Sequence, residues 1–488
     1  MGEQRDVVVV GGGPVGVAMG MMCARRGLSA VVLERSTEVY DLPRAIVMDD
    51  EIQRAVALAG AGDGLRAVIS PLPGAEFVDA AGTRIIGLEI PDGFESPLGF
   101  PPVARYYQPD LEHFLRSSAV AAGASLQLGV EAVSFEQQAE GVTVSCADGS
   151  IEHGRWLVAA DGAASPIRKS LGIAFDDQGF DQDWLVVDVR LHDGAEPALP
   201  LLVRQVCDPA RPTTFVPGHD RYRRWEFQLQ QGETRESMTS PERVWSLLSP
   251  WLTPDDARLV RAVVYRFHAT VASTMRSGSV FIAGDAAHQM PPFLGQGLCS
   301  GVRDAANLAW KLEMVKAGSA GDRLLDTYDL ERRPHAAGVV AHAVDTGRLI
   351  DQLAGRGGGQ DGLDSAYGGQ RPFPHLVDGF RTGDHPLVGR QMPNVPCAVG
   401  GRLDDVTLRD GHTGIVVAVP DSWPMDGGHA AALSAWKAIG AAVVSVAEPV
   451  AFGAHAAVIV RPDRYVAAVS AAPAEFAAHT ASLMDALR

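Results

Sequence analysis

The sequence predicts an α/β fold, and three observations support this. Residues 6–10 read DVVVV, which is typical of a buried parallel strand; glycines at 11–13 follow, then a helical segment to about residue 26 and a second strand at 30–33. Residues 176–270 alternate apolar and polar segments with turn residues between them, as expected for an antiparallel sheet. Residues 385–488 show a separate, smaller α/β pattern.

These patterns divide the chain into domains. We expect a discontinuous Rossmann-like domain built from residues 1–75, 100–175 and 271–350, with an inserted sheet domain from 76–99 and 176–270. The glycine-rich segment 355–369 is the clearest linker, and it lies inside an expected linker region 351–384. The last domain, 385–488, has predicted strands at 415–419 and 441–446, a hairpin around 461–464 and a final helix from about 472.

Composition excludes several classes of protein. The chain has 488 residues, 46% of them hydrophobic, and a formal net charge of −17, which argues against nucleic acid as a partner. Its 5 cysteines include no CxxC pair and fit a reducing cytoplasm, where we place the protein.

The apolar run 7–24 is interrupted by three glycines and Pro14, so we interpret it as a buried strand and helix. No other apolar run could span a bilayer, and we expect no membrane partner.

The first motif, GGGPVG at 11–16, has the GxGxxG spacing. The first glycine permits a tight turn, the second lets a pyrophosphate approach the backbone, and the third lets the helix pack closely on the strand. An acidic residue at the end of the second strand can bind ribose hydroxyl groups. The candidate cofactor-binding residues in this region are Gly11, Gly13, Pro14, Val15, Gly16, Glu34 and Arg35.

A second motif far downstream indicates FAD rather than NAD. Residues 279–297 read SVFIAGDAAHQMPPFLGQG, so that Asp285 lies at the mouth of a short strand, where it could accept hydrogen bonds from ribityl hydroxyl groups. The helix that follows could direct its N-terminus at the polar edge of a flavin ring. Asp161-Gly162 supplies a third, weaker motif. The candidate cofactor-binding residues here are Asp161, Asp285, Pro292, Gly295, Gly297, Leu298 and Cys299.

With these motifs in order, the chain resembles the single-component aromatic flavoprotein monooxygenases related to p-hydroxybenzoate and phenol hydroxylases. Within them it is most similar to the 3-(3-hydroxyphenyl)propionate hydroxylase group, through stretches such as PRAIVMDDE, GDAAHQMPPFLGQG and RPDRYVAAV. The resemblance implies a glutathione-reductase type FAD domain, an inserted substrate domain and a thioredoxin-like C-terminal domain without thiol chemistry, which would serve packing or homodimer contacts.

The resemblance also implies site residues. Arg44 would approach the flavin, and Gln108 would contact the ribityl or phosphate region. Relatives commonly carry Asn where this chain has Cys299, which removes a side-chain amide contact but leaves a backbone N–H.

The implied reaction uses FAD, O₂ and NADH or NADPH. A reduced flavin would form a C4a-hydroperoxide, and a small phenolic substrate would attack its distal oxygen, so the pocket must exclude water and a base or polar relay must activate the phenol. No separate nicotinamide-binding motif is visible, and the relatives favour NADH.

The activating residue is left open. His219, Tyr222 and Arg223 are the candidate catalytic residues, and the Arg223-Arg224 pair could bind a substrate carboxylate. A surface or turn position is the alternative explanation for His219, and a solvated strand face is the alternative for the arginine pair. His288 is expected to fix the loop after the GD motif by a backbone hydrogen bond. No residue is assigned to a metal.

Two other functions remain open. One is a tailoring hydroxylase of a polyketide or an antibiotic, which would share all three motifs. The other is a flavoprotein oxidase or dehydrogenase without oxygen insertion, which would yield H₂O₂ and no hydroxylated product.

Overall fold

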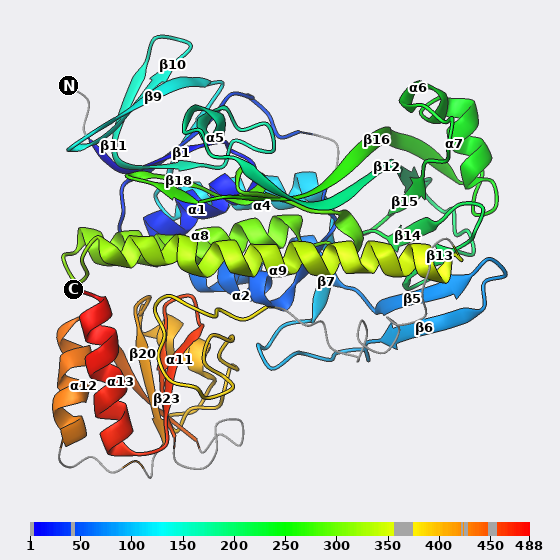
Figure 1. The fold of residues 1–488 in the computed structure, drawn as a ribbon. Coiled ribbons are helices and arrows are strands. Elements are labelled where there is room, and N and C mark those ends of the chain that lie inside the picture. Colours follow the sequence, from blue (N-terminus) through cyan, green and yellow to red (C-terminus); the bar gives the residue numbers. More distant parts are fainter. Residues whose placement is uncertain (1–3, 41–43, 356–373, 421–422, 424–427, 448–455) are drawn as a thin grey trace.

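A computed structural model describes residues 4–40, 44–355, 374–420, 423, 428–447 and 456–488 (Figure 1). Two large sheets lie end to end, two long helices run beneath them, and the C-terminal domain lies against the helical side (Figure 1). No helix in these ranges is both long and apolar enough to cross a membrane.

The first sheet is formed around the predicted β–α–β unit, which is confirmed. Strand β1 (Arg5–Val10) pairs in parallel with β2 (Ala30–Glu34), and α1 (Pro14–Arg25) connects them. The strand order is β17-β18-β11-β1-β2-β8, and β9 and β10 extend from β11 as an antiparallel hairpin. The further bounds are β8 Ser125–Leu128, β9 Ala132–Gln138, β10 Gly141–Cys146, β11 Ile151–Ala159, β17 Arg276–Ser277 and β18 Val280–Ile282.

This sheet is buried because its strands are nearly all aliphatic. Val7, Val8 and Val9 have no exposed surface, as expected for a parallel strand covered on both faces. Helices α1, α4 (Gln108–Ala121) and α8 (Gly297–Lys316) pack on it. Smaller elements connect to the second sheet: β3 Val47–Asp49, α2 Asp50–Val56, a π-helical turn Ala57–Ala61, α3 Gly62–Val68, β4 Ile69–Pro71, β7 Val103–Tyr106 and α5 Pro166–Ser170.

The second sheet has the order β19-β16-β12-β15-β14-β13-β5-β6. It is antiparallel as predicted from β16 to β13, but β13 pairs in parallel with β5, so the sheet is mixed at that end. Long strands β12 and β16 extend from the first sheet into the second (Figure 1). The bounds are β5 Gly74–Asp79, β6 Arg84–Glu89, β12 Phe175–Leu191, β13 Val203–Cys207, β14 Thr213–Pro217, β15 Tyr222–Gln228, β16 Ala257–Ala272 and β19 His288–Gln289.

The faces of this sheet differ in character. Leu185, Val187, Phe215 and Trp225 point to one side and form an apolar core with α6 (Arg235–Met238) and α7 (Pro241–Leu248). Because side chains alternate along a strand, the residues between them face the other way. That other face turns toward the carboxyl ends of the strands of the first sheet and carries polar side chains.

Helix α9 (Arg323–Leu353) runs across most of the molecule and contacts β17 of the first sheet and β12, β13 and β16 of the second (Figure 1). It continues past residue 350, so the first residues of the expected linker 351–384 are still helical. The glycine-rich stretch at 356–369 lies outside the described residues.

The C-terminal domain is a four-stranded sheet of order β21-β20-β22-β23. Its predicted strands and hairpin are confirmed, with β20 and β21 parallel and the other pairs antiparallel. Buried ionic contacts join it to the rest: Arg54 to Asp404 at 2.7 Å and Arg461 to Glu331 at 2.8 Å. The bounds are α11 Leu403–Arg409, β20 Val416–Pro420, α12 Gly428–Ala438, β21 Ala442–Val446, β22 Ala457–Val460, β23 Val466–Ser470 and α13 Pro473–Ala486.

Candidate active site

A cavity of about 2150 Å³ lies between the two large sheets. One wall comes from the loops at the carboxyl ends of β1, β2, β11 and β18, and the facing wall comes from β13, β14 and β15. Ligands of open α/β sheets bind at the carboxyl ends of the strands, so the first wall is where a dinucleotide is expected. Fourteen predicted cofactor-binding residues line this cavity: Gly11, Gly13, Pro14, Val15, Glu34, Arg35, Arg44, Gln108, Asp161, Asp285, Pro292, Gly295, Gly297 and Leu298.

The glycine turn has the geometry that a pyrophosphate requires. A Cβ at Gly11 would lie 2.2 Å from the carbonyl oxygen of Ala160, and one at Gly16 would lie 1.9 Å from that of Gly11. These two glycines are therefore needed for packing. A Cβ at Gly13 would meet no atom within 4 Å, because this residue faces the open cavity at the start of α1. First-turn N–H groups of a helix lack intrahelical partners, so this end of α1 can bind an anion.

Glu34 lies beside this turn, where the adenosine half of a dinucleotide is expected. Its carboxylate accepts hydrogen bonds from the backbone N–H of Gly12 at 2.6 Å and of Ser36 at 2.8 Å. Both contacts hold the carboxylate at the end of β2, on the cavity wall. Glu34 thus orders the turn itself while its remaining lone pairs can accept hydrogen bonds from ribose hydroxyl groups.

The DG and GD motifs place two carboxylates on the same wall. Asp161 accepts a hydrogen bond from the Ile167 N–H at 3.3 Å through Oδ2, whereas its Oδ1 is buried without a hydrogen-bond partner among the described residues. Burial raises the pKa of Asp161. Asp285 is exposed and lines the cavity. An unpartnered buried acceptor and an exposed carboxylate together suit a ligand that brings several hydroxyl groups, as the ribityl chain of FAD does.

The segment after the GD motif leads into α8. Gly295 has φ 64°, and a Cβ there would lie 2.2 Å from a methyl group of Val47, so only glycine fits. A Cβ at Gly297 would meet nothing within 4 Å, so the N-terminus of α8, like that of α1, opens into the cavity.

Gln296, between these glycines, was not among the predicted residues. It is buried and lines the cavity, and its Oε1 accepts a hydrogen bond from Arg303 at 2.9 Å. Its Nε2 has no hydrogen-bond partner among the described residues, which leaves a donor for the carbonyl edge of a flavin. Its place inside the GQG turn was the signal that could have identified it.

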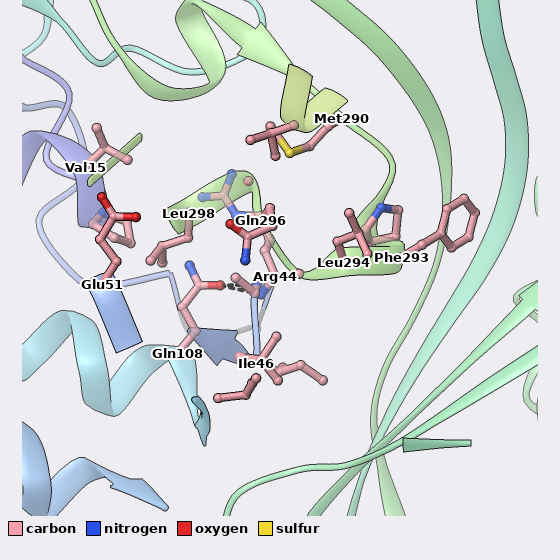
Figure 2. Close-up of a pocket in the computed structure, with 18 of the residues that line it drawn as sticks. Val15, Arg44, Ile46, Glu51, Gln108, Met290, Phe293, Leu294, Gln296 and Leu298 are labelled. Carbon is pink, nitrogen blue, oxygen red and sulfur yellow. Dashed lines mark hydrogen bonds between the residues drawn. The ribbon is translucent and has the colours of Figure 1, made fainter. Parts of the chain in front are cut away.

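Gln108 positions the segment around Arg44. Its Oε1 accepts hydrogen bonds from the N–H groups of Arg44 and Ala45, both at 2.6 Å, and its Nε2 donates to Glu112 at 2.6 Å (Figure 2). The sequence suggests a direct FAD contact for Gln108. The structure shows its carboxamide occupied by the protein, so that it holds the Arg44 backbone in the cavity wall.

Two predicted cofactor residues do not line the cavity. Gly16 lies behind the turn, against Gly11. Cys299 is fully buried, with its Sγ 3.7 Å from the carbonyl oxygen of Gly295. The thiol therefore faces the loop and not the space where a flavin ring would lie.

The three candidate catalytic residues also lie outside the cavity lining. His219 contacts the Ser70 hydroxyl at 3.0 Å, and Tyr222 stacks on Tyr107 with ring centroids 3.8 Å apart. Arg223 donates to the backbone carbonyls of Asp220 and Tyr222. Strand alternation turns Arg223 away and Arg224 inward. His219 and Tyr222 make contacts outside the cavity lining, so the structure does not support a catalytic role for these three.

His288 fixes the GD loop through a carboxylate and not through the backbone bond that the sequence suggests. Its Nε2 lies 2.7 Å from Oδ2 of Asp304, and the same oxygen accepts the N–H of Gly284 at 3.0 Å. Arg332 donates to the other oxygen of Asp304 at 2.8 Å. All of these side chains are buried behind the cavity wall.

The facing wall is the polar side of the second sheet. We call the inward side chains of Gln205, Thr214, Arg224 and Glu226 the sheet wall. Strand register sets them side by side: Gln205 is opposite Thr214, and Thr214 is opposite Glu226. Arg224 makes a bidentate ion pair with Asp188 at 2.7 and 3.1 Å and donates to the carbonyl oxygen of Arg44 at 2.6 Å. The last bond links the sheet wall to the opposite wall of the cavity. We call that opposite wall, formed by the loops at the carboxyl ends of β1, β2, β11 and β18, the cofactor wall.

Comparison with known proteins agrees with this geometry. Residues 4–343 match the model of the FAD binding domain, and residues 385–488 match that of the aromatic-ring hydroxylase C-terminal domain. The chain is 39% identical over 352 residues to a probable NADH-specific resorcinol 4-hydroxylase of Rhodococcus jostii (strain RHA1). That match covers 70% of this chain and 65% of the relative, somewhat less than two thirds of the relative's length.

Two further likenesses cover almost the whole chain. It is 32% identical to a 3-(3-hydroxy-phenyl)propionate/3-hydroxycinnamic acid hydroxylase of Escherichia coli (strain K12), over 95% of this chain and 92% of that protein. The structure of aklavinone-11 hydroxylase with FAD and aklavinone has the same fold, with a TM-score of 0.81, 24% identity and full coverage of both chains. The family match and the cofactor wall together show that this chain belongs to the FAD-dependent aromatic-ring hydroxylases.

Proposed function

We propose that this protein inserts one oxygen atom of O₂ into the ring of a small phenol, with NADH as the electron donor. The observation that carries this proposal is that one cavity joins the cofactor wall to the polar sheet wall. A ring bound against the sheet wall would lie next to the polar edge of a flavin held at Gly297 and Gln296. The balanced reaction converts phenol, O₂, NADH and one proton into the hydroxylated phenol, NAD⁺ and water.

The residues on the cofactor wall fit FAD, as the open faces of Gly13 and Gly297 and the unpartnered atoms of Asp161 and Gln296 indicate. When bound and reduced, FAD supplies the activated oxygen atom. The N-termini of α1 and α8 would hold the cofactor, and Arg44 and the Pro292–Leu294 turn line the same cavity and would contact it. We propose the other residues of this wall as FAD contacts, with Gln108 holding the Arg44 segment within the wall and Gly16 and Cys299 packing behind it.

Water exclusion is the second task of the protein, because water in the site diverts reduced flavin and O₂ to H₂O₂. Phe293 and Met290 line the cavity, and Phe293 packs edge-on against Phe180 and Trp184 with centroids 5.8 and 5.3 Å apart. Phe180, Phe293 and Met290 pack with Val340 and Val344 of α9 and give this part of the cavity wall an apolar surface.

The domain roles are part of the same proposal. We assign the parallel sheet to a glutathione-reductase type FAD domain, the second sheet to substrate binding and residues 385–488 to a thioredoxin-like domain. Cys397 is the single cysteine of that last domain. It is buried, and burial raises the pKa of its thiol, so this domain has no dithiol chemistry. Its buried ion pairs with the FAD domain favour a packing role.

The test uses the purified yellow protein with NADH, NADPH and a panel of phenols. We expect a phenol to stimulate NADH oxidation, with hydroxylated product formed in proportion to the NADH consumed and NADPH used less efficiently. If no phenol stimulates turnover, the proposed function is wrong. If H₂O₂ accounts for all the O₂ consumed, the protein is an oxidase and not a hydroxylase.

A further inference from the structure

We propose that Glu226 binds and activates a hydroxyl group of a neutral, polyhydric phenol, and that the sheet wall disfavours phenols that carry a carboxylate. This inference rests on the proposed function and names its substrate class. Glu226 lies on β15 between Thr214 and Val186 of the neighbouring strands. It lines the cavity although only 6% of its surface is exposed.

The cations beside Glu226 are already occupied by the protein. Arg224 uses Nε and Nη2 on Asp188 and Nη1 on the carbonyl oxygen of Arg44. Arg261, behind it, donates to Asp188 at 3.0 Å and to the hydroxyl oxygen of Tyr265 at 3.0 Å. A guanidinium group binds a substrate carboxylate bidentately through two adjacent N–H groups. In Arg224 and in Arg261, two such N–H groups already contact Asp188.

Glu226 itself is held only loosely by this network. Its Oε1 lies 4.0 Å from Nη1 of Arg224, beyond hydrogen-bond distance. Its carboxylate is therefore an acceptor directed at the cavity without a close protein donor in the described contacts. A buried acceptor of this kind gains most from a ligand that brings a hydroxyl group.

The rest of the sheet wall also favours hydroxyl donors. The Thr214 hydroxyl donates to Oε1 of Gln205 at 2.5 Å, so its own oxygen can accept a hydrogen bond from a ligand. Gln205 Nε2 donates to the backbone carbonyls of Val206 and Thr213. Two acceptors, Glu226 and Thr214, stand opposite each other on adjacent strands. A phenol with two hydroxyl groups matches them, whereas a carboxylate would add like charge in a buried site.

Glu226 is also suited to take the proton. Burial raises its pKa despite the opposing charges of Arg224 and Arg261, and Asp188 raises it further. A carboxylate with a raised pKa is a stronger base toward a phenol, whose pKa is about 10. In the step, the phenol O–H bond breaks and a Glu226 O–H bond forms, so the negative charge moves to the ring oxygen and activates the ortho carbon. The proton returns to solvent or product after hydroxylation.

This role fixes the sign of the pH dependence. The carboxylate accepts a proton only above the pKa of Glu226 in the folded protein, so kcat/KM for a neutral phenol should fall as the pH drops through that value. The charged groups next to Glu226 are Arg224, Arg261 and Asp188, and both guanidinium groups pair with the Asp188 carboxylate. The hydroxyl of Tyr265, which also lines the cavity, accepts a hydrogen bond from Arg261.

The experiment compares resorcinol, a neutral dihydric phenol, with 3-(3-hydroxyphenyl)propionate in the FAD-loaded protein, by chromatography of the products. We expect the wild type to favour resorcinol at least about tenfold in kcat/KM. Glu226→Gln keeps the size of the side chain and removes the base, and should lower kcat/KM for resorcinol about 100-fold or more, within the usual range for loss of a general base. It should also abolish the acidic limb of the pH profile. Glu242→Gln, on the exposed start of α7, is the matched control.

The outcomes separate this inference from the proposed function. If no phenol yields product, the proposed function itself fails. If the wild type hydroxylates the propionate as well as or better than resorcinol, the substrate class proposed here is wrong, and that measurement needs no variant to fold. If Glu226→Gln retains FAD and keeps both the rate and the acidic limb, Glu226 is not the base.

Discussion

The two walls of the cavity hold their polar groups in different ways. On the cofactor wall, the groups are backbone N–H donors and single side chains within short motifs, such as Glu34 bonded to the N–H of Gly12. The sheet wall carries the side chains of Gln205, Thr214, Arg224 and Glu226, and behind it Arg224 and Arg261 pair with Asp188 across three strands. The first wall depends on local backbone shape, and the second depends on strand register.

This difference has a consequence for mutation. Changes at Gly13 and Gly297 on the cofactor wall should affect FAD binding with little effect on folding, because these two residues face empty space. Changes in the ionic cluster behind the sheet wall should affect folding first, because an unpaired buried charge is costly. The following substitutions test that contrast, beginning with the largest expected effect.

Asp188→Ala should lower the free energy of unfolding by ~3–5 kcal/mol, because it leaves Arg224 and Arg261 buried without their carboxylate. Thermal and denaturant unfolding of the FAD-loaded protein would measure this. Asp183→Ala, at an exposed position of the same strand, is the control and should change stability by about 0.5 kcal/mol or less. Equal effects of the two substitutions would contradict the contrast between the walls.

Gly13→Val should yield a folded but colourless protein. Gly13 has an extended backbone (φ −72°, ψ 179°) that any residue adopts, and its side chain would enter the space where a pyrophosphate is expected. We expect FAD affinity to fall about 100-fold or more, on the order of 3 kcal/mol, as measured by titration of the apoprotein. Gly16→Val should instead lose both folding stability and FAD, since its Cβ would collide with the Gly11 carbonyl. A yellow Gly13→Val protein would refute this placement of the turn.

Gln108→Ala should weaken FAD binding to a smaller degree. It leaves the N–H groups of Arg44 and Ala45 without their acceptor, at a cost of about 1–3 kcal/mol, and loosens the segment that carries Arg44. Gln108→Glu keeps the acceptor and should retain most of the affinity. If Gln108 contacts FAD directly through its Nε2, the Glu variant would lose as much affinity as the Ala variant.

Cys299→Ala should have the smallest effect. The thiol is buried behind the loop and does not line the cavity, so FAD affinity should change less than about threefold and stability by about 1 kcal/mol. The flavin absorption spectrum should keep its position and shape. A displaced spectrum would show that the side chain at this position reaches the flavin environment after all.

The cofactor wall could be predicted almost residue by residue. Glycine spacing, the strand before it and the acidic residue after the next strand are local features, and a βαβ unit leaves few ways to arrange them. The resemblance extended this to Arg44 and Gln108. It did not show that the side-chain oxygen of Gln108 accepts the Arg44 N–H. That contact joins residues 64 positions apart, so no local pattern in the sequence indicates it.

The sheet wall could not be predicted in this way. The sequence RYRRWEFQ suggests a strand, but alternation alone does not say which set of residues faces the cavity. His219, Tyr222 and Arg223 were therefore as reasonable as Arg224 and Glu226. The apolar partners Trp225 and Phe227 were a usable signal, because they pack against α6 and α7 and so turn Arg224 and Glu226 to the opposite face.

The sequence by itself determined the fold class, the cofactor and the motifs that bind it. The motifs are short, and only certain residues, such as glycine in a tight turn, can adopt the backbone conformations that they require. Only the tertiary structure decided which groups meet a substrate. Asp188 pairs with Arg224 at a separation of 36 residues and with Arg261 at 73, through the register of three strands. Such pairing depends on how whole strands align, and a one-residue shift would turn every one of these side chains to the other face.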